Sequence, residues 1–254
     1  MKLNVHITGE MPGSWRTALA ELADDLQFNI CDSGTEIRCR RGEGIAVVCD
    51  GEAVELTWGA DVEFFRALSL IPVPLAHCDI REKANFRSAG PMFDCSRNGV
   101  VNPEAMRFFI RKMALMGLNL GMMYTEDTYE VDGEPFFGYL RGRYTQAELQ
   151  GVSEYCHSIG IEVIPEMDIP GHTVAILAAY PELSCSHLKA DTVVVGHTTN
   201  RMVCAANAKS YEVLTDVINE IAPLFASPYI HLGGDEAAVP ANWAKCADCQ
   251  AMMS

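Results

Sequence analysis

Tyr229-Ile230-His231-Leu232-Gly233-Gly234-Asp235-Glu236 is the stretch of sequence that predicts the fold best. Its first four residues are apolar enough for a short buried strand, two glycines can turn the chain, and two carboxylates follow. In α/β proteins with parallel strands, functional groups lie at the C-terminal ends of the strands. Two adjacent acids repel each other, so we expect one to hold a proton while the other stays charged.

The composition is that of an acidic globular protein. The 254 residues are 49% hydrophobic and 21% charged, which suffices for one large or two small domains. The net charge of -15 disfavours nucleic acid or an anionic membrane as a partner, and no segment is apolar over the length of a membrane span. Residues 1–6 lack the apolar core of a signal peptide, so we expect a cytoplasmic protein with mostly free thiols.

Residues 1–85 are expected to form a small α+β domain without catalytic groups. Strand patterns occur at 5–7, 36–39, 45–49 and 53–57, and helical spacing recurs at 15–26 and 62–70. Asp50-Gly51 is a hairpin signal between the last two strands. Residues 72–74, Pro-Val-Pro, are typical of a linker or of the end of a helix.

From Gly90 onward, strand and helix patterns alternate. Strands are expected at 91–93, 118–124, 161–165 and 229–232, and helices after Asn102, after the capping box Thr145-x-x-Glu148, and at 211–221. Residues 86–254 are therefore predicted to form the first four β/α units of an incomplete (β/α)8 TIM-type barrel. Because such a barrel closes with eight units, we expect a part of a longer enzyme, or a piece that pairs with another chain.

Four segments together resemble the family 20 glycoside hydrolases, the β-N-acetylhexosaminidases. The stretch 231–236 is similar to the family's acid-pair signature, and 163–173 is similar to its third-strand motif. Residues 179–185 and 243–250 resemble the segments that flank these motifs in bacterial members. The resemblance runs from about residue 87 to residue 254.

The resemblance implies a glycosidase that uses the substrate's own acetamido group as the nucleophile. Glu236 would protonate the glycosidic oxygen as the general acid, and Asp235 would orient the 2-acetamido group. Terminal GlcNAc or GalNAc would be released from oligosaccharides or glycoconjugates with retention, and no cofactor is implied. Without the motifs, a solvated loop or a helix N-cap would be favoured over a catalytic pair.

Further residues of the motifs are expected to contact the sugar. The resemblance implies such a role for Asp168 and His172, and for one or both of Glu126 and Asp127. A structural turn and an acidic surface loop are the alternatives. The arginine that many members carry before the first barrel strand is replaced by Ala89, and Arg87 could substitute for it.

Arg97 and two pairs of cysteines complete the candidates. Arg97 is expected to pair with a carboxylate. Cys246-x-x-Cys249 is half of a zinc motif, but the sequence shows no second CxxC, so we favour plain thiols and assign no metal ligand. Cys185 and Cys204 flank one loop and could form a disulfide under oxidising conditions.

Two rival functions remain open on the sequence alone. The chain could be a truncated, inactive or merely sugar-binding piece of such an enzyme. Alternatively, it could be a metal-assisted hydrolase whose ligands are the acids and histidines of the strand ends, Asp168, His172, His231 and Asp235.

Overall fold

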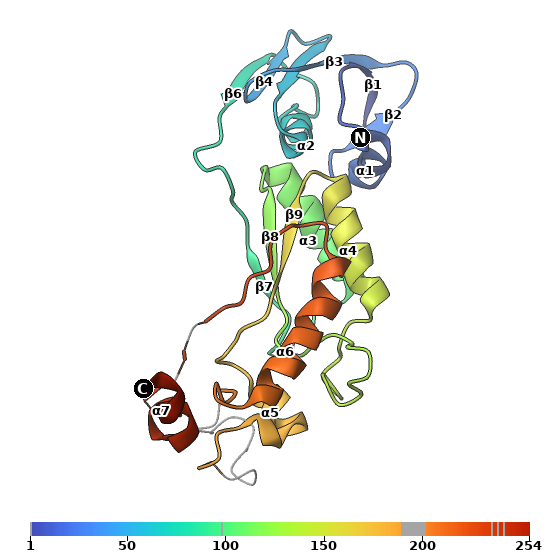
Figure 1. Ribbon diagram of the computed structural model, residues 1–254. Helices are drawn as coiled ribbons and strands as arrows, with labels where there is room; N and C mark the ends of the chain where they lie inside the picture. Colours follow the sequence, from blue (N-terminus) through green and yellow to red (C-terminus); the bar gives the residue numbers. More distant parts are fainter. Residues whose placement is uncertain (1, 98, 189–201, 235, 238, 241) are drawn as a thin grey trace. The chain divides into compact units, whose positions relative to one another are not determined.

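The computed structural model describes residues 2–97, 99–188, 202–234, 236–237, 239–240 and 242–254 (Figure 1). The chain divides into two compact units. The first comprises residues 1–91, 103–121 and 154–162, and the second comprises residues 92–102, 122–153 and 163–254.

The first unit is built on a six-stranded mixed sheet of order β2-β1-β3-β5-β4-β6. Parallel pairing joins β1 to β2 and β3, and β3 to β5, whereas β4 is antiparallel to β5 and β6. The bounds of these strands are β1 Leu3–Gly9, β2 Phe28–Ile30, β3 Thr35–Arg41, β4 Ile45–Cys49, β5 Val54–Trp58 and β6 Cys78–Glu82.

Alternating burial shows why these strands form and where the core lies. Val47 and Leu56 are buried on neighbouring strands, while Val48 and Glu55 beside them are exposed. The predicted hairpin between β4 and β5 is confirmed, because the Asp50 carboxylate accepts two backbone N–H groups within the turn. The sequence patterns missed β2 and β6, which are a three-residue strand and an edge strand.

Helices α1 Trp15–Leu22, α2 Asp61–Ser69 and α3 Pro103–Met116 lie wholly within this unit, and one of them forms much of its core. Helix α2 packs against β4, β5 and α3, and both Phe64 and Phe65 are fully buried there. Helix α3 begins at Pro103, as predicted, and Gly117 with a φ of 77° follows its last turn.

The remaining elements carry the candidate site. The strands β7 Met92–Asp94, β8 Leu120–Tyr124 and β9 Glu162–Glu166 form one sheet in that order, and β7 is parallel to β8. Thr145 and Glu148 form the predicted capping box at the start of α4. In the described residues, the helices are α4 Gln146–Ser158, α5 Val174–Ala179, α6 Ala208–Ile221 and α7 Ala247–Met253, with the 3-10 turns η1 Pro181–Leu183, η3 Ala222–Leu224 and η4 Trp243–Lys245.

The predicted fourth strand at 229–232 is reduced to a single bridge. His231 pairs with Glu166 of β9 in parallel, and backbone hydrogen bonds on either side continue the contact for a few residues. Gly233 and Gly234 then adopt φ values of 66° and 102°, which turn the chain away before a ladder can extend. In the described part of the chain, no helix combines the length and the apolar character needed to cross a bilayer.

Candidate active site

Polar side chains occupy the C-terminal ends of three neighbouring strands. Asp94 ends β7, Tyr124 ends β8 and Glu166 ends β9. The chain beyond β9 turns back at Asp168, and the bridge at His231 places the glycine turn beside it. A pocket of about 290 Å³ opens here, lined by Met92, Asp94, Arg97, Tyr124, Glu166, His231 and Gly233.

Tyr124 links two carboxylates at the centre of this cluster. Its hydroxyl lies 2.8 Å from Glu126 Oε1 and 3.3 Å from Asp168 Oδ2. Burial, together with the negative charge of Glu126, raises the pKa of Tyr124 above its ordinary value. The hydroxyl therefore stays protonated and donates to a carboxylate, which fixes the position of that acid.

Arg97 brings positive charge to the end of β7. Its Nη1 lies 2.7 Å from Asp94 Oδ2, so the predicted pairing with a carboxylate is confirmed. Its Nη2 lies 3.2 Å from His172 Nδ1, and the guanidinium stacks over the Tyr124 ring. Although burial opposes it, hydrogen bonds from Ser96 and Arg97 lower the pKa of Asp94, which therefore stays ionised at neutral pH.

His172 lies among three carboxylates. Its Nε2 is 3.3 Å from Glu236 Oε2 and 3.7 Å from Asp168 Oδ2, and its Nδ1 is 3.6 Å from Glu126 Oε1. The Asp168 side chain is fully buried, whereas 62% of the Glu236 side chain is exposed. The imidazole therefore joins a buried acid to an acid that a ligand can reach.

Backbone strain is concentrated at this site. In the described residues, five non-glycine residues have a positive φ, and three of them are Glu126, His172 and Glu236, at 47°, 49° and 46°. The left-handed conformation is unfavourable for such side chains and persists where the surrounding structure enforces it. The backbone of these three residues thus helps to fix how their side chains meet, in addition to the contacts between the side chains.

The glycine turn is shaped around Asp168. The backbone N–H of Gly234 donates to Asp168 Oδ1 at 2.9 Å. A Cβ atom at Gly233 would lie 2.3 Å from that same oxygen and 2.7 Å from the Asp168 Cα atom, so only glycine fits there. Glu166 Oε1 lies 2.9 Å from His231 Nδ1, which anchors the chain just before the turn.

The two acids after β8 have different surroundings. Glu126 faces His172, whereas Asp127 is buried and lies 3.3 Å from Arg141 Nε. Burial raises the pKa of both carboxyls, and in each case the nearby cations only partly offset it. Arg141 also donates to the carbonyl oxygen of Ser96 at 2.6 Å, so its loop is tied to the end of β7.

The raised pKa of Glu126 predicts a pH-dependent effect of Glu126→Gln on stability. A raised folded-state pKa means that stability is complete below the unfolded value and is lost as the pH rises through the folded value. Glutamine mimics the neutral acid at every pH. The stability of Glu126→Gln relative to the parent should therefore increase as the pH rises from about 4 to 7, by on the order of 1 kcal/mol after solvent screening.

Urea denaturation of both proteins at several pH values measures this effect. Glu130→Gln is a suitable control, because Glu130 is more exposed and lies on the same loop. A stability difference that stays constant or shrinks with rising pH would show that burial does not raise the Glu126 pKa.

Most of the site residues predicted from sequence lie together. The imidazole of His172 is surrounded by the carboxylates of Glu126, Asp168 and Glu236. Asp127, next to Glu126 in the sequence, instead contacts Arg141. Asp235 lies outside the described residues. Arg87 belongs to the first unit, so the geometry of this cluster does not bear on its predicted role.

Tyr124 and Glu166 were not assigned a site role from the sequence. Each contacts a residue that the sequence singled out, Tyr124 through Glu126 and Glu166 through His231. Both are the last residues of their strands, which is where functional groups are expected. Strand-end position alone, however, does not tell which side chain turns inward.

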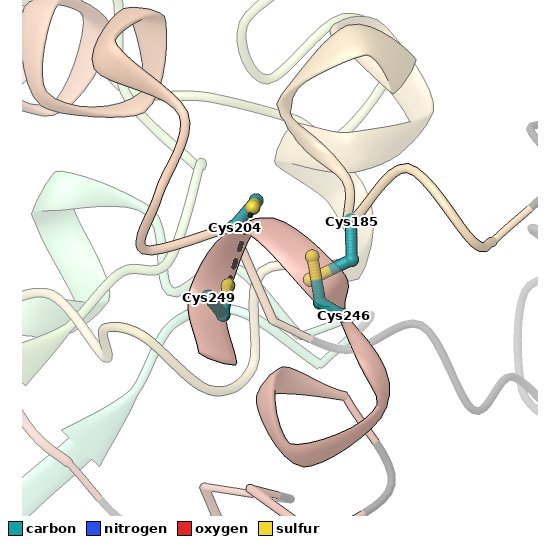
Figure 2. A group of neighbouring side chains, drawn as sticks. All are labelled: Cys185, Cys204, Cys246 and Cys249. Atoms are coloured by element: carbon teal, nitrogen blue, oxygen red, sulfur yellow. Dashed lines mark hydrogen bonds between the residues drawn. The ribbon is translucent and has the colours of Figure 1, made fainter. Parts of the chain in front are cut away.

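The cysteines form a cluster that the sequence spacing did not indicate. Plain thiols were favoured at Cys246 and Cys249 because the sequence has no second CxxC. Cys185 and Cys204, which are far from this pair in sequence, lie beside it, and the four sulfur atoms all lie within 4.8 Å of one another (Figure 2). All ten cysteines are free, so the disulfide considered for Cys185 and Cys204 is not formed.

Comparisons with known proteins point to one family. Residues 100–254 match the model of glycosyl hydrolase family 20, catalytic domain. The chain is 30% identical over 204 residues to a beta-hexosaminidase of Porphyromonas gingivalis, covering 72% of this chain and 26% of that protein. It is 40% identical over 111 residues to a beta-hexosaminidase of Akkermansia muciniphila, covering 43% of this chain and 22% of that protein.

The fold agrees with this relationship. A solved family 20 exo-β-N-acetylglucosaminidase from Vibrio harveyi superposes with a TM-score of 0.80 at 24% identity, covering 99% of this chain and 46% of that one. The chain thus spans about a quarter of the curated relatives and about half of the solved structure. Because the family model matches more than half of its residues, this chain belongs to glycosyl hydrolase family 20.

Proposed function

We propose that this chain carries the acid-base centre of a β-N-acetylhexosaminidase that releases terminal β-linked GlcNAc or GalNAc from oligosaccharides or glycoconjugates. The observation that carries the proposal is the contact of Glu236 with His172, which in turn contacts the buried Asp168. An accessible carboxyl beside an imidazole and a second acid is suited to giving a proton to a leaving group and taking it back from water.

In this proposal, Glu236 is the general acid and His172 positions it. The imidazole Nε2–H can donate to only one acceptor at a time. Nε2 lies 3.3 Å from Glu236 Oε2 and 3.7 Å from Asp168 Oδ2, so a small movement would select either acid. When Glu236 is ionised, the imidazole can donate to it; when Glu236 is protonated, Asp168 can accept instead. The same ring therefore supports both protonation states of the acid during one turnover.

Asp235 is proposed to orient the 2-acetamido group, whose carbonyl oxygen attacks the anomeric carbon. The anomeric C–O bond breaks as Glu236 protonates the departing oxygen, and an oxazolinium intermediate forms on the sugar. Water then opens this ring while Glu236 removes its proton, so the configuration is retained. The backbone N–H of Gly234, the residue before Asp235, donates to Asp168. This hydrogen bond fixes the chain directly before the acid pair and supports the proposal.

Sugar hydroxyls are proposed to bind at the end of β7. Asp94 and Arg97 line the pocket and are partly exposed, so they offer an acceptor and donors to one hydroxyl pair. Arg87 is also proposed to bind the sugar, in place of the arginine that many family members carry at the position of Ala89. The net charge of -15 also agrees with a neutral substrate rather than an anionic one.

The architecture proposed for the whole is a small N-terminal α+β domain, residues 1–85, followed by the first four β/α units of a TIM-type barrel, residues 86–254. Three strands and the bridge at His231 support the order of these units. Completion of the barrel by a further segment or by a second chain, and a cytoplasmic location, belong to the same proposal.

Hydrolysis of a fluorogenic β-GlcNAc substrate by this chain tests the function directly. Release of the fluorophore together with GlcNAc of retained configuration supports the proposal. Binding of GlcNAc measured by calorimetry, without any turnover, would identify a sugar-binding piece instead.

The metal-assisted alternative makes a different prediction. It requires that activity lost to a chelator return with Zn²⁺, and that it disappear when His231 is replaced by alanine in folded protein. Circular dichroism of the chelated protein separates loss of a catalytic metal from loss of structure.

A further inference from the structure

A cluster of four cysteines lies apart from the proposed acid-base centre. Cys185 follows η1, Cys204 precedes α6, Cys246 precedes α7, and Cys249 lies within α7. The most exposed of the four is only 3% exposed. Figure 2 shows the side chains converging from these segments, with the sulfur atoms on the inside.

The geometry points to a structural zinc site with these four thiolates as ligands. All four sulfur atoms lie within 4.8 Å of one another, and those of Cys204 and Cys249 are 3.5 Å apart. In a zinc site with Zn–S bonds of about 2.3 Å, tetrahedral geometry sets the sulfur–sulfur distance at about 3.8 Å. A shift of less than about 1 Å per sulfur would therefore complete the coordination sphere.

The sequence spacing of the cluster also suits zinc. Cys246-x-x-Cys249 has the close spacing of a zinc-binding pair at the start of a helix, and the other pair comes from a separate loop. Binding of one Zn²⁺ would release the protons of the thiols and leave a ZnS4 centre with two negative charges.

Hydrophobic packing alone explains the cluster less well. Free cysteines do pack as small apolar side chains, but such packing does not require four sulfur atoms to face one another. The apolar neighbours, Leu188, Ala205, Ala206 and Trp243, surround the cluster rather than separate its members. Two disulfides are the other way to join four thiols, but all four cysteines are free. The Cys204 and Cys249 sulfur atoms, for example, are 3.5 Å apart, far longer than a disulfide bond of about 2.05 Å.

A metal at this place would stabilise the end of the described chain. Helix α7 has seven residues, too few to be stable in isolation. Its segment is otherwise attached by the apolar packing around the cysteines and by polar contacts such as the Trp243 indole donating to the Val203 carbonyl oxygen at 2.9 Å. The zinc would tie this segment, which follows Glu236, to the loops that precede α6.

Cobalt titration of the reduced, chelator-treated chain under anaerobic conditions tests the site. We expect one Co²⁺ per chain, with thiolate charge-transfer bands and the intense visible d–d bands of tetrahedral sulfur coordination, and displacement of the Co²⁺ by one Zn²⁺. Addition of Zn²⁺ should also raise the melting temperature by about 5 °C or more.

Variants make the result specific to these four residues. Cys249→His should keep the metal but shift the d–d bands, because one sulfur ligand becomes nitrogen, and Cys246→Ser with Cys249→Ser should abolish the spectrum. The control Cys31→Ser with Cys78→Ser replaces two thiols of the first unit and should leave the cobalt spectrum unchanged. Three results would overturn the proposal. The first is the absence of a tetrahedral cobalt spectrum from protein whose ten thiols are all shown to be reduced. The others are an unchanged spectrum in the double serine variant and two disulfides in the unreduced protein.

Discussion

Replacing Glu236 by glutamine is expected to lower kcat/KM for β-linked N-acetylhexosaminides by about 10²- to 10⁴-fold. Glutamine keeps the shape of the side chain and its proximity to His172 Nε2, which lies 3.3 Å from the carboxylate oxygen. It cannot, however, give up a proton. The loss therefore measures the proton transfer itself rather than the packing around it.

The size of the loss should depend on the leaving group. A sugar or alkyl alcohol leaves poorly without a proton, whereas a phenol of low pKa leaves with little help. We expect the full loss for a disaccharide and a clearly smaller loss for a nitrophenyl or fluorogenic glycoside. Steady-state kinetics on both substrates measures the ratio.

Glu212→Gln is the matched control for this experiment. Glu212 is exposed on α6 and has no place in the site, so its replacement should leave both rates unchanged. An equal loss on both substrates for Glu236→Gln would assign Glu236 a role other than the general acid.

Secondary structure was the part of this chain most accessible to sequence reasoning. The apolar stripe between Asn102 and Gly117 predicted α3, and the Thr145 capping box predicted α4, because local hydrogen bonds and helical spacing determine both. The strand expected at 229–232 depends on pairing with β9, which the apolar pattern of the segment does not reveal. His231 alone forms a bridge to Glu166, and directly after it the positive φ of Gly233 turns the chain.

The candidate site was predicted only in part for a similar reason. Motif residues such as Asp168 and His172 could be chosen from the sequence, because their turn lies at the end of a strand. The partners of those residues come from other strands, and nothing in the local sequence of Tyr124 shows that its hydroxyl links Glu126 to Asp168. The cysteines show the same limit, since Cys204 precedes Cys246 by 42 positions in the sequence.

Gly233→Ala is expected to damage the site through a steric clash and through backbone strain together. The added Cβ would lie 2.3 Å from Asp168 Oδ1 and 2.7 Å from the Asp168 Cα atom, and because the second contact is to backbone, rotation of the side chain cannot relieve it. Left-handed strain adds about 1–3 kcal/mol and overpacking adds a similar amount. We expect a loss of about 2–6 kcal/mol of stability, together with displacement of the turn that carries the acid pair.

Gly234→Ala separates the steric clash from the backbone strain. Gly234 also has a positive φ, 102°, but a Cβ atom there would meet nothing within 4 Å. Strain alone should therefore affect both variants, whereas the clash with Asp168 affects only Gly233→Ala. We expect kcat/KM to fall at least about tenfold further in Gly233→Ala than in Gly234→Ala, because misplacing a catalytic group by about 1 Å costs much of the rate. Urea denaturation and kinetics of the two variants measure this difference, and equal losses in both would mean that Asp168 does not hold the turn in place.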